Sequence, residues 1–116
     1  TGCAIVHSDS ASGIQRLNQE AAKALAAGRK AGFDISEGRA MTWITKNPAK
    51  SLGILDQTGT LEQGKDADIV IWSGNPFSIY SKAEKVFIDG ALAFDKATNF
   101  MPHTDFDIGV KEWEDK

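Results

Sequence analysis

The chain has 116 residues, of which 41% are hydrophobic and 25% are charged, and its formal net charge at pH 7 is −3. This composition is typical of a globular domain and excludes a disordered chain. Acidic and basic residues are interspersed without a basic stripe, so nucleic acid is not an expected partner. No apolar run approaches the ~20 residues that span a bilayer, so a membrane is not expected as a partner either.

The chain is predicted to begin with a buried strand. Residues 3–6 are all apolar, and the polar residues 7–10 follow at once, which is typical of a parallel strand covered on both faces. Proteins with alternating strands and helices place their chemistry at the carboxyl ends of such strands. A parallel strand needs neighbours, and none precedes this one, so we expect the sequence to be a piece of a larger protein.

Cys3 is the only cysteine, which excludes an internal disulfide and favours a reducing, cytoplasmic environment. We expect it to be a small buried hydrophobic residue. A nucleophilic role would need a nearby base, for which His7 is the candidate.

Helices are predicted next. Apolar residues at spacings of three and four, together with many alanines, indicate a helix over residues 14–31. Ser36 is a good N-cap for a second helix, which Asn47 before a proline should end. A third, short helix is expected over residues 48–52, with Gly53 after its end.

The remainder favours strands. Residues 69–72 are the strongest strand prediction, because they combine β-branched and aromatic side chains. Residues 85–88 and 91–94 flank the pair Asp89-Gly90, which is typical of the type I′ turn of a hairpin. Periodicity is lost from about residue 98 onward.

Three segments together resemble the C-terminal end of the amidohydrolase superfamily. They are residues 4–9, residues 45–53 and, most specifically, residues 59–72. The resemblance is nearest to imidazolonepropionase-like and related cyclic-amide or dipeptide hydrolases. It implies an α/β fold in which residues 1–55 are the last strand and following helices of a (β/α)8 barrel. Residues 56–97 would be part of a small composite β-sandwich, and residues 98–116 an irregular tail.

The resemblance also implies a metal site. The family uses a His-x-His pair, a lysine or glutamate, two more histidines and an aspartate on the eighth strand, and Asp9 matches that aspartate. The chain has two histidines and no His-x-His pair, so a divalent metal, zinc foremost, is expected in the full-length protein and not in this chain alone. Asp9 would be both metal ligand and general base, and would pass the proton to the leaving nitrogen.

Two further residues are candidates for substrate binding. His7 lies two residues before Asp9, so both side chains should point to the same side of the strand. It would contact substrate or a neighbouring carboxylate, or it is a packed interior histidine, and both interpretations stay open. Ser10 and Ser12 lie in the following loop, where a substrate contact and plain loop capping are the alternatives.

The resemblance implies hydrolysis of a C–N bond in a small molecule, either an amide or a cyclic amide, by metal-activated water. The alternative is a non-catalytic module that folds or oligomerises through its β region. An apolar strand with unpaired edges and the apolar face of an amphipathic helix would need another chain segment to pack on them. The expected partners are therefore a small-molecule amide substrate and either a second copy of the chain or the missing barrel portion.

Overall fold

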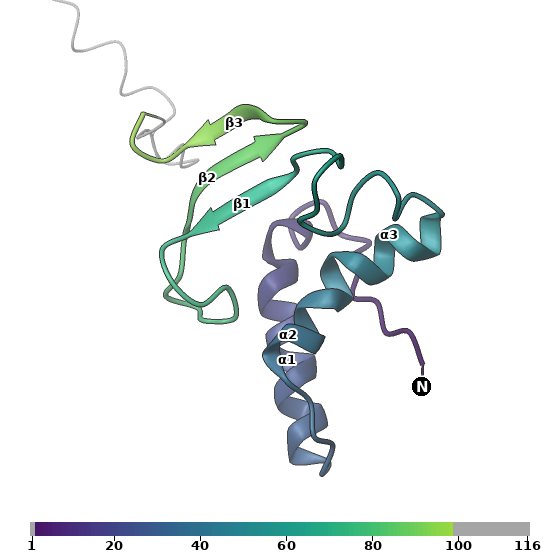
Figure 1. Ribbon diagram of the computed structural model, residues 1–116. Helices are drawn as coiled ribbons and strands as arrows, with labels where there is room; N and C mark the ends of the chain where they lie inside the picture. Colours follow the sequence, from purple (N-terminus) through teal and green to yellow (C-terminus); the bar gives the residue numbers. More distant parts are fainter. Residues whose placement is uncertain (1, 99–116) are drawn as a thin grey trace, which may run out of the picture.

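The computed structural model describes residues 2–98, in which helices come first and strands last (Figure 1). No helix in this range is long and apolar enough to span a bilayer. The elements in chain order are η1 Ile14–Arg16, α1 Leu17–Lys30, α2 Glu37–Met41, η2 Thr42–Ile44, α3 Lys46–Leu52, β1 Ile69–Trp72, β2 Ala83–Ile88 and β3 Ala91–Asp95. The predicted tail lies almost entirely outside the described residues.

Most of the predicted helix boundaries agree with the structure. The helix predicted over residues 14–31 is present as η1 followed by α1. Ser36 caps α2, because its hydroxyl accepts the backbone N–H of Arg39 at 3.1 Å. Gly53, with φ of 75°, follows the last residue of α3 as expected.

The predicted stop of the second helix at Asn47-Pro48 is wrong. The chain leaves helical geometry earlier, at Thr45, where φ is −130° and ψ is −89°. The next helix, α3, begins at Lys46, so Pro48 lies in its first turn. A first-turn residue has no helical partner for its N–H, and the missing proline N–H therefore costs nothing there.

The predicted strand at residues 3–6 is not formed, and Cys3 is exposed, so its predicted burial is wrong. A β-strand requires a neighbouring strand to pair with, and residues 2–98 place no strand beside this segment. Ala4 and Ile5 are exposed as well. The barrel to which this segment was assigned stays a prediction.

A small core holds the helices together. Leu25 of α1, Ala40 of α2 and Trp43 of η2 are buried against one another. Three partly buried residues pack on this cluster from three different segments, namely Val6, Ile35 and Phe77. The core therefore draws in the segment before α1 and the loop between β1 and β2, as well as the helices.

The three strands form one antiparallel sheet in the order β1-β2-β3. The predicted hairpin is confirmed: Asp89 and Gly90 join β2 to β3 with φ values of 52° and 78°, as a type I′ turn requires. Phe87 pairs with Ile69 on one side and Leu92 on the other, which places apolar side chains across the sheet. The predicted strand at residues 69–72 is also confirmed.

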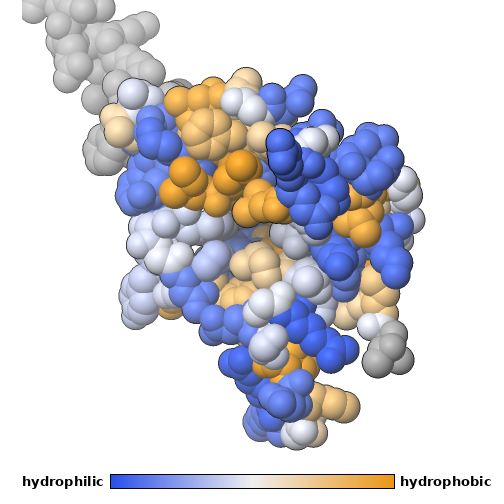
Figure 2. Space-filling model, viewed as in Figure 1, coloured by the Kyte–Doolittle hydropathy of each residue, from blue (hydrophilic) through white to orange (hydrophobic). Residues whose placement is uncertain are grey.

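The sheet is apolar on both faces. Val70 shares one face with its register partner Val86, and Phe87 and Leu92 share the other. Figure 2 shows a hydrophobic patch over the sheet. An antiparallel sheet that is covered on one face alternates apolar and polar residues, whereas this pattern favours cover on both faces. Its place in a β-sandwich stays a prediction.

The loop between β1 and β2 joins the sheet to the helices. Asn18 of α1, a buried polar residue, donates its side-chain N–H to the Pro76 carbonyl at 2.6 Å. Asn75 donates to the Glu37 carboxylate of α2 at 3.0 Å, and Phe77 packs on the helical core. The loop thus contacts two helices.

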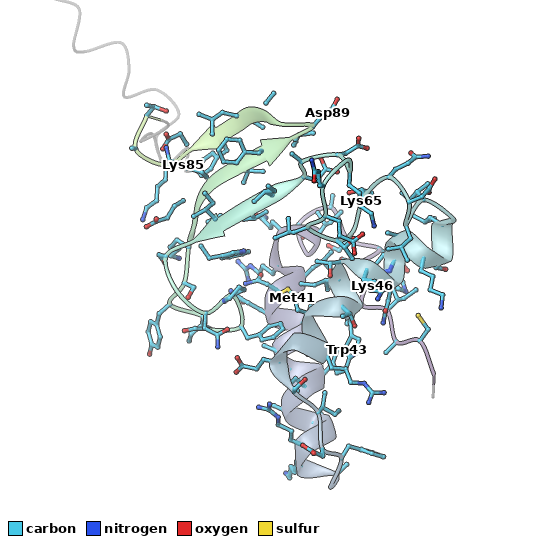
Figure 3. The ribbon with its side chains drawn as sticks, in the orientation of Figure 1. Met41, Trp43, Lys46, Lys65, Lys85 and Asp89 are labelled. Carbon is cyan, nitrogen blue, oxygen red and sulfur yellow. The ribbon has the colours of Figure 1, made fainter. Side chains whose placement is uncertain are left out.

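Lys65 organises the loop that precedes β1 (Figure 3). Its side chain is only 12% exposed, and its ammonium donates to the Leu55 carbonyl and the Thr60 hydroxyl, both at 2.6 Å. It also pairs with Glu62 at 2.8 Å, and this hydrogen bond lowers the pKa of the Glu62 carboxyl. Lys65 is therefore a structural residue, because three oxygens satisfy its buried charge.

Asp68 ties the same loop to the tip of the hairpin. One carboxylate oxygen accepts the Asp89 backbone N–H, and the other accepts the Thr58 hydroxyl, each at 3.0 Å. These two contacts give Asp68 a structural role at the entry to β1.

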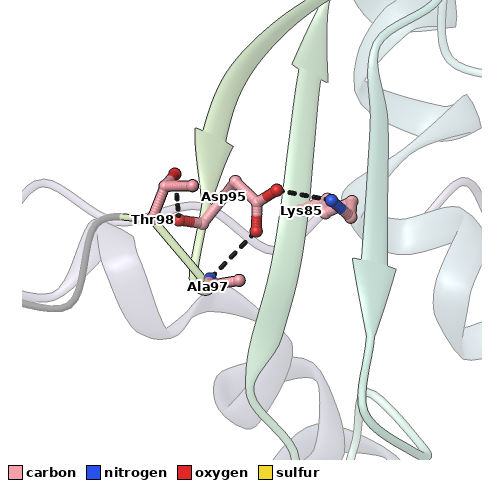
Figure 4. Close-up of polar contacts among 4 residues, drawn as sticks. All are labelled: Lys85, Asp95, Ala97 and Thr98. Atoms are coloured by element: carbon pink, nitrogen blue, oxygen red, sulfur yellow. Dashed lines mark hydrogen bonds and ion pairs between the residues drawn. The ribbon is translucent and has the colours of Figure 1, made fainter.

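Lys85 and Asp95 are register partners on β2 and β3, and they form an ion pair (Figure 4). The hydrogen bond from Lys85 holds the pKa of the Asp95 carboxyl below its usual range, and the backbone N–H of Ala97 adds to this effect. A depressed carboxyl pKa contributes stability above the ordinary value of 3.8, and this contribution is lost as the pH falls through the folded value.

Asp95→Asn should therefore make the free energy of unfolding less dependent on pH in the acid range. The amide keeps the side-chain shape but cannot titrate, so the free energy of unfolding should fall less steeply between about pH 5 and pH 2. Urea unfolding across that range measures the slope. Asp56→Asn, at an exposed position, is the matched control. Equal slopes for Asp95→Asn and the unsubstituted protein would contradict the prediction.

Gly90→Val should weaken the β2–β3 hairpin by about 1–3 kcal/mol, because a β-branched residue resists the positive φ of this turn. Hydrogen exchange of the β2 and β3 amides measures the loss. Ala91→Val is the control, since Ala91 is exposed and lies in the strand itself. Unchanged protection in Gly90→Val would show that the turn does not set this register.

Candidate functional site

Asp9 and His7 lie on an exposed segment before η1. The side chain of Asp9 is 97% exposed and that of His7 is 76% exposed. His7 Nδ1 lies 3.5 Å from Asp9 Oδ1, so the two side chains approach each other although the segment is not a strand. His7 and Asp9 are thus brought together, as are Ser10 and Ser12 in the loop that follows.

Two hydrogen bonds dock this segment on the helices. The backbone N–H of Val6 donates to the Trp43 carbonyl at 3.1 Å. The side chain of Asn47, the second residue of α3, donates to the Ala4 carbonyl at 2.7 Å. Because Val6 also packs on the core, the segment is anchored just before His7 and Asp9.

Ser10 belongs to the turn that follows Asp9. Its hydroxyl accepts the Gly13 backbone N–H at 3.1 Å and lies 3.0 Å from the Ser12 hydroxyl. These contacts are those of a loop cap, the alternative to substrate binding for Ser10 and Ser12. The substrate contact proposed for Ser10 stays a prediction.

An open hollow of about 540 Å³ lies between this segment and α1. Residues 5–8 and Gly13 line one side of it, and Glu20 and Ala24 of α1 line the other. Sequence reasoning did not select Glu20, because a charged residue outside the apolar stripe of a helix looks like a solvated one. Glu20 Oε1 pairs with Lys23 Nζ at 2.6 Å, so its charge already has a partner.

The donor set for a metal is partial. Within the described part of the chain, no group of three or more His, Cys, Asp or Glu side chains could hold a metal ion. A zinc site takes three protein ligands and a water in its catalytic form. His7 and Asp9 are chemically suited to zinc, but they fit only as part of a ligand set that other residues complete.

Comparison with known proteins gives consistent matches. The model of the family described as "Amidohydrolase family" matches residues 4–101. An imidazolonepropionase of Brucella suis is 52% identical over 40 residues, which is 34% of this chain and 10% of that protein. An imidazolonepropionase of Thermoplasma volcanium is 42% identical over 67 residues, covering 53% of this chain and 17% of that protein.

A solved structure agrees with these matches. The crystal structure of an amidohydrolase from Thermotoga maritima superposes with a TM-score of 0.59 at 42% sequence identity. The match covers 67% of this chain and 19% of that one. The chain therefore spans less than a fifth of the length of the relatives described here.

Proposed function

The chain belongs to the amidohydrolase family, and on that premise we propose that it is the C-terminal part of a metal-dependent hydrolase. The full protein would cleave a C–N bond in a small amide or cyclic amide. Because the chain matches at most 19% of the relatives described above, the rest of the active site would come from the remaining polypeptide.

The family match over residues 4–101 carries this proposal, and the geometry of Asp9 is compatible with it. Asp9 presents an exposed carboxylate at the end of a segment that Val6 anchors to the core. The contact with His7, at 3.5 Å, leaves the carboxylate oxygens free to accept a proton or to bind a cation. Exposed carboxylates are common on protein surfaces, and it is the family match over residues 4–101 that favours a catalytic role for this one.

In this proposal Asp9 is one ligand of a divalent metal, with zinc as the favoured ion. The metal, when bound, would supply Lewis acidity and lower the pKa of a bound water towards ~7. The other ligands would lie outside the described residues, since these provide only a partial donor set.

Asp9 would also move the proton. A carboxylate oxygen of Asp9 would accept a proton from the attacking water and later deliver it to the leaving nitrogen. His7 lies beside this carboxylate, where its imidazole would contact the substrate or a neighbouring carboxylate. In either case His7 would act beside Asp9 on the same segment.

The substrate class is proposed from the relatives. Two of the similar proteins are named imidazolonepropionases, a name that favours a cyclic amide for this protein as well. Dipeptides are the second class to screen.

We further propose that apolar elements of this chain pack on the remaining polypeptide or on a second copy. Ile5 and Ile14 are exposed near Asp9, and Ile88 and Leu92 are exposed on the sheet. Exposed apolar residues on neighbouring elements favour cover by another chain segment.

Asp9→Asn in the full-length protein should lower kcat by at least ~100-fold, because asparagine keeps the shape but removes the proton acceptor. The assay screens cyclic amides and dipeptides and then follows the best substrate. Asp56→Asn, an exposed aspartate after α3, is the matched control and should hydrolyse at the unsubstituted rate. Full activity in Asp9→Asn would refute the assignment.

The alternative is a non-catalytic module that folds or oligomerises through its β region, and metal content separates the two. Elemental analysis should find one or two metals per full-length chain and none at stoichiometric level in the 116-residue chain, because the described residues hold only part of a donor set. A full-length protein that is free of metal after growth in zinc, and that self-associates in sedimentation equilibrium through this chain, would favour the non-catalytic module.

A further inference from the structure

The contacts of the Asp9 side chain do not fix its direction. The side chain is 97% exposed, and its contact is a 3.5 Å approach to His7, which is itself mostly exposed. So loose a contact cannot hold the side chain in one direction. The order that the structure provides at this position lies in the backbone on either side of Asp9.

The Ser8 hydroxyl closes a ring across Asp9. It accepts the backbone N–H of Ser10 at 3.1 Å and donates to the Ser10 carbonyl at 3.3 Å. A serine hydroxyl can do both at once, because it has one donor and two acceptor lone pairs. Asp9 is the residue between these two anchor points, so the ring restrains its φ and ψ directly.

Gly13 provides the space that this ring needs. A Cβ at Gly13 would lie 2.9 Å from Ser8 Oγ and 3.2 Å from Ser10 Cβ. The backbone of Gly13, with φ of −78° and ψ of −28°, is open to any residue, so the glycine is needed for room and not for conformation. A side chain here would push the Ser8 hydroxyl away from Ser10.

We propose that Ser8 is a positioning residue for Asp9. Its hydroxyl acts through the backbone of Ser10, and the lack of a side chain at Gly13 leaves room for that hydroxyl. This inference rests on the proposed function of Asp9. The ring restrains the Asp9 backbone, so a cation that binds the carboxylate would not need to order the loop first. Groups that orient a metal ligand typically contribute 10–100-fold to affinity or activity.

Three variants of the full-length protein test this assignment. Ser8→Ala should weaken zinc binding, measured by competition with a chelator, and lower kcat by about tenfold each, with KM within about twofold. Ser8→Thr keeps the hydroxyl and should restore both quantities. Gly13→Ala, which displaces the hydroxyl without removing it, should reproduce the losses of Ser8→Ala.

The double variant Ser8→Ala/Gly13→Ala adds an independent measurement. If Gly13 acts only through the Ser8 hydroxyl, the double variant should be no worse than Ser8→Ala. Ser51→Ala, an exposed serine on α3, is the control for a general effect of removing a hydroxyl. Thermal unfolding of every variant should stay within a few degrees of the unsubstituted protein, since an exposed turn contributes little to stability.

The outcomes separate this inference from the proposed function. If Asp9→Asn is inactive while Ser8→Ala keeps its zinc affinity and kcat, the positioning role is overturned and the function of Asp9 stands. A loss in Ser8→Ala that Ser8→Thr does not restore, or that accompanies a large drop in unfolding temperature, also overturns it. Full activity in Asp9→Asn would instead remove the proposed function and the inference together.

Discussion

The hydrogen bond from Asn18 to the Pro76 carbonyl joins the two parts of this chain. The described helices and strands do not pack directly on one another, and the loop between β1 and β2 supplies contacts that relate them. Asn18 is buried and lies 58 positions from Pro76 in the sequence. A buried amide without a partner is costly, so this bond both satisfies Asn18 and fixes where the loop sits.

The same core connects that loop to the candidate site. Phe77 packs on the cluster that contains Trp43, and the Trp43 carbonyl accepts the backbone N–H of Val6. Val6 lies three residues before Asp9, so the loop between β1 and β2 and the segment that carries Asp9 meet on one group of side chains.

The candidate site was visible in the sequence only in part. The family resemblance singled out Asp9, and the spacing of two suggested His7 as its neighbour; in the structure their side chains approach to 3.5 Å on a segment that is not a strand. The ring made by Ser8 and the space left by Gly13 were not predicted. Serine and glycine are common in loops, and nothing in their order says which hydroxyl meets which backbone group.

The sequence by itself determined the local features of this protein. The Ser36 cap and the Asp89-Gly90 turn depend on residues within a few positions, so the pattern alone predicts them. Only the tertiary structure decided that Asn18 would meet Pro76, because that contact depends on how α1 and a distant loop pack on a shared core. The burial of the first segment was mispredicted for the same reason: a strand is made by its neighbours, and they are not part of the local sequence.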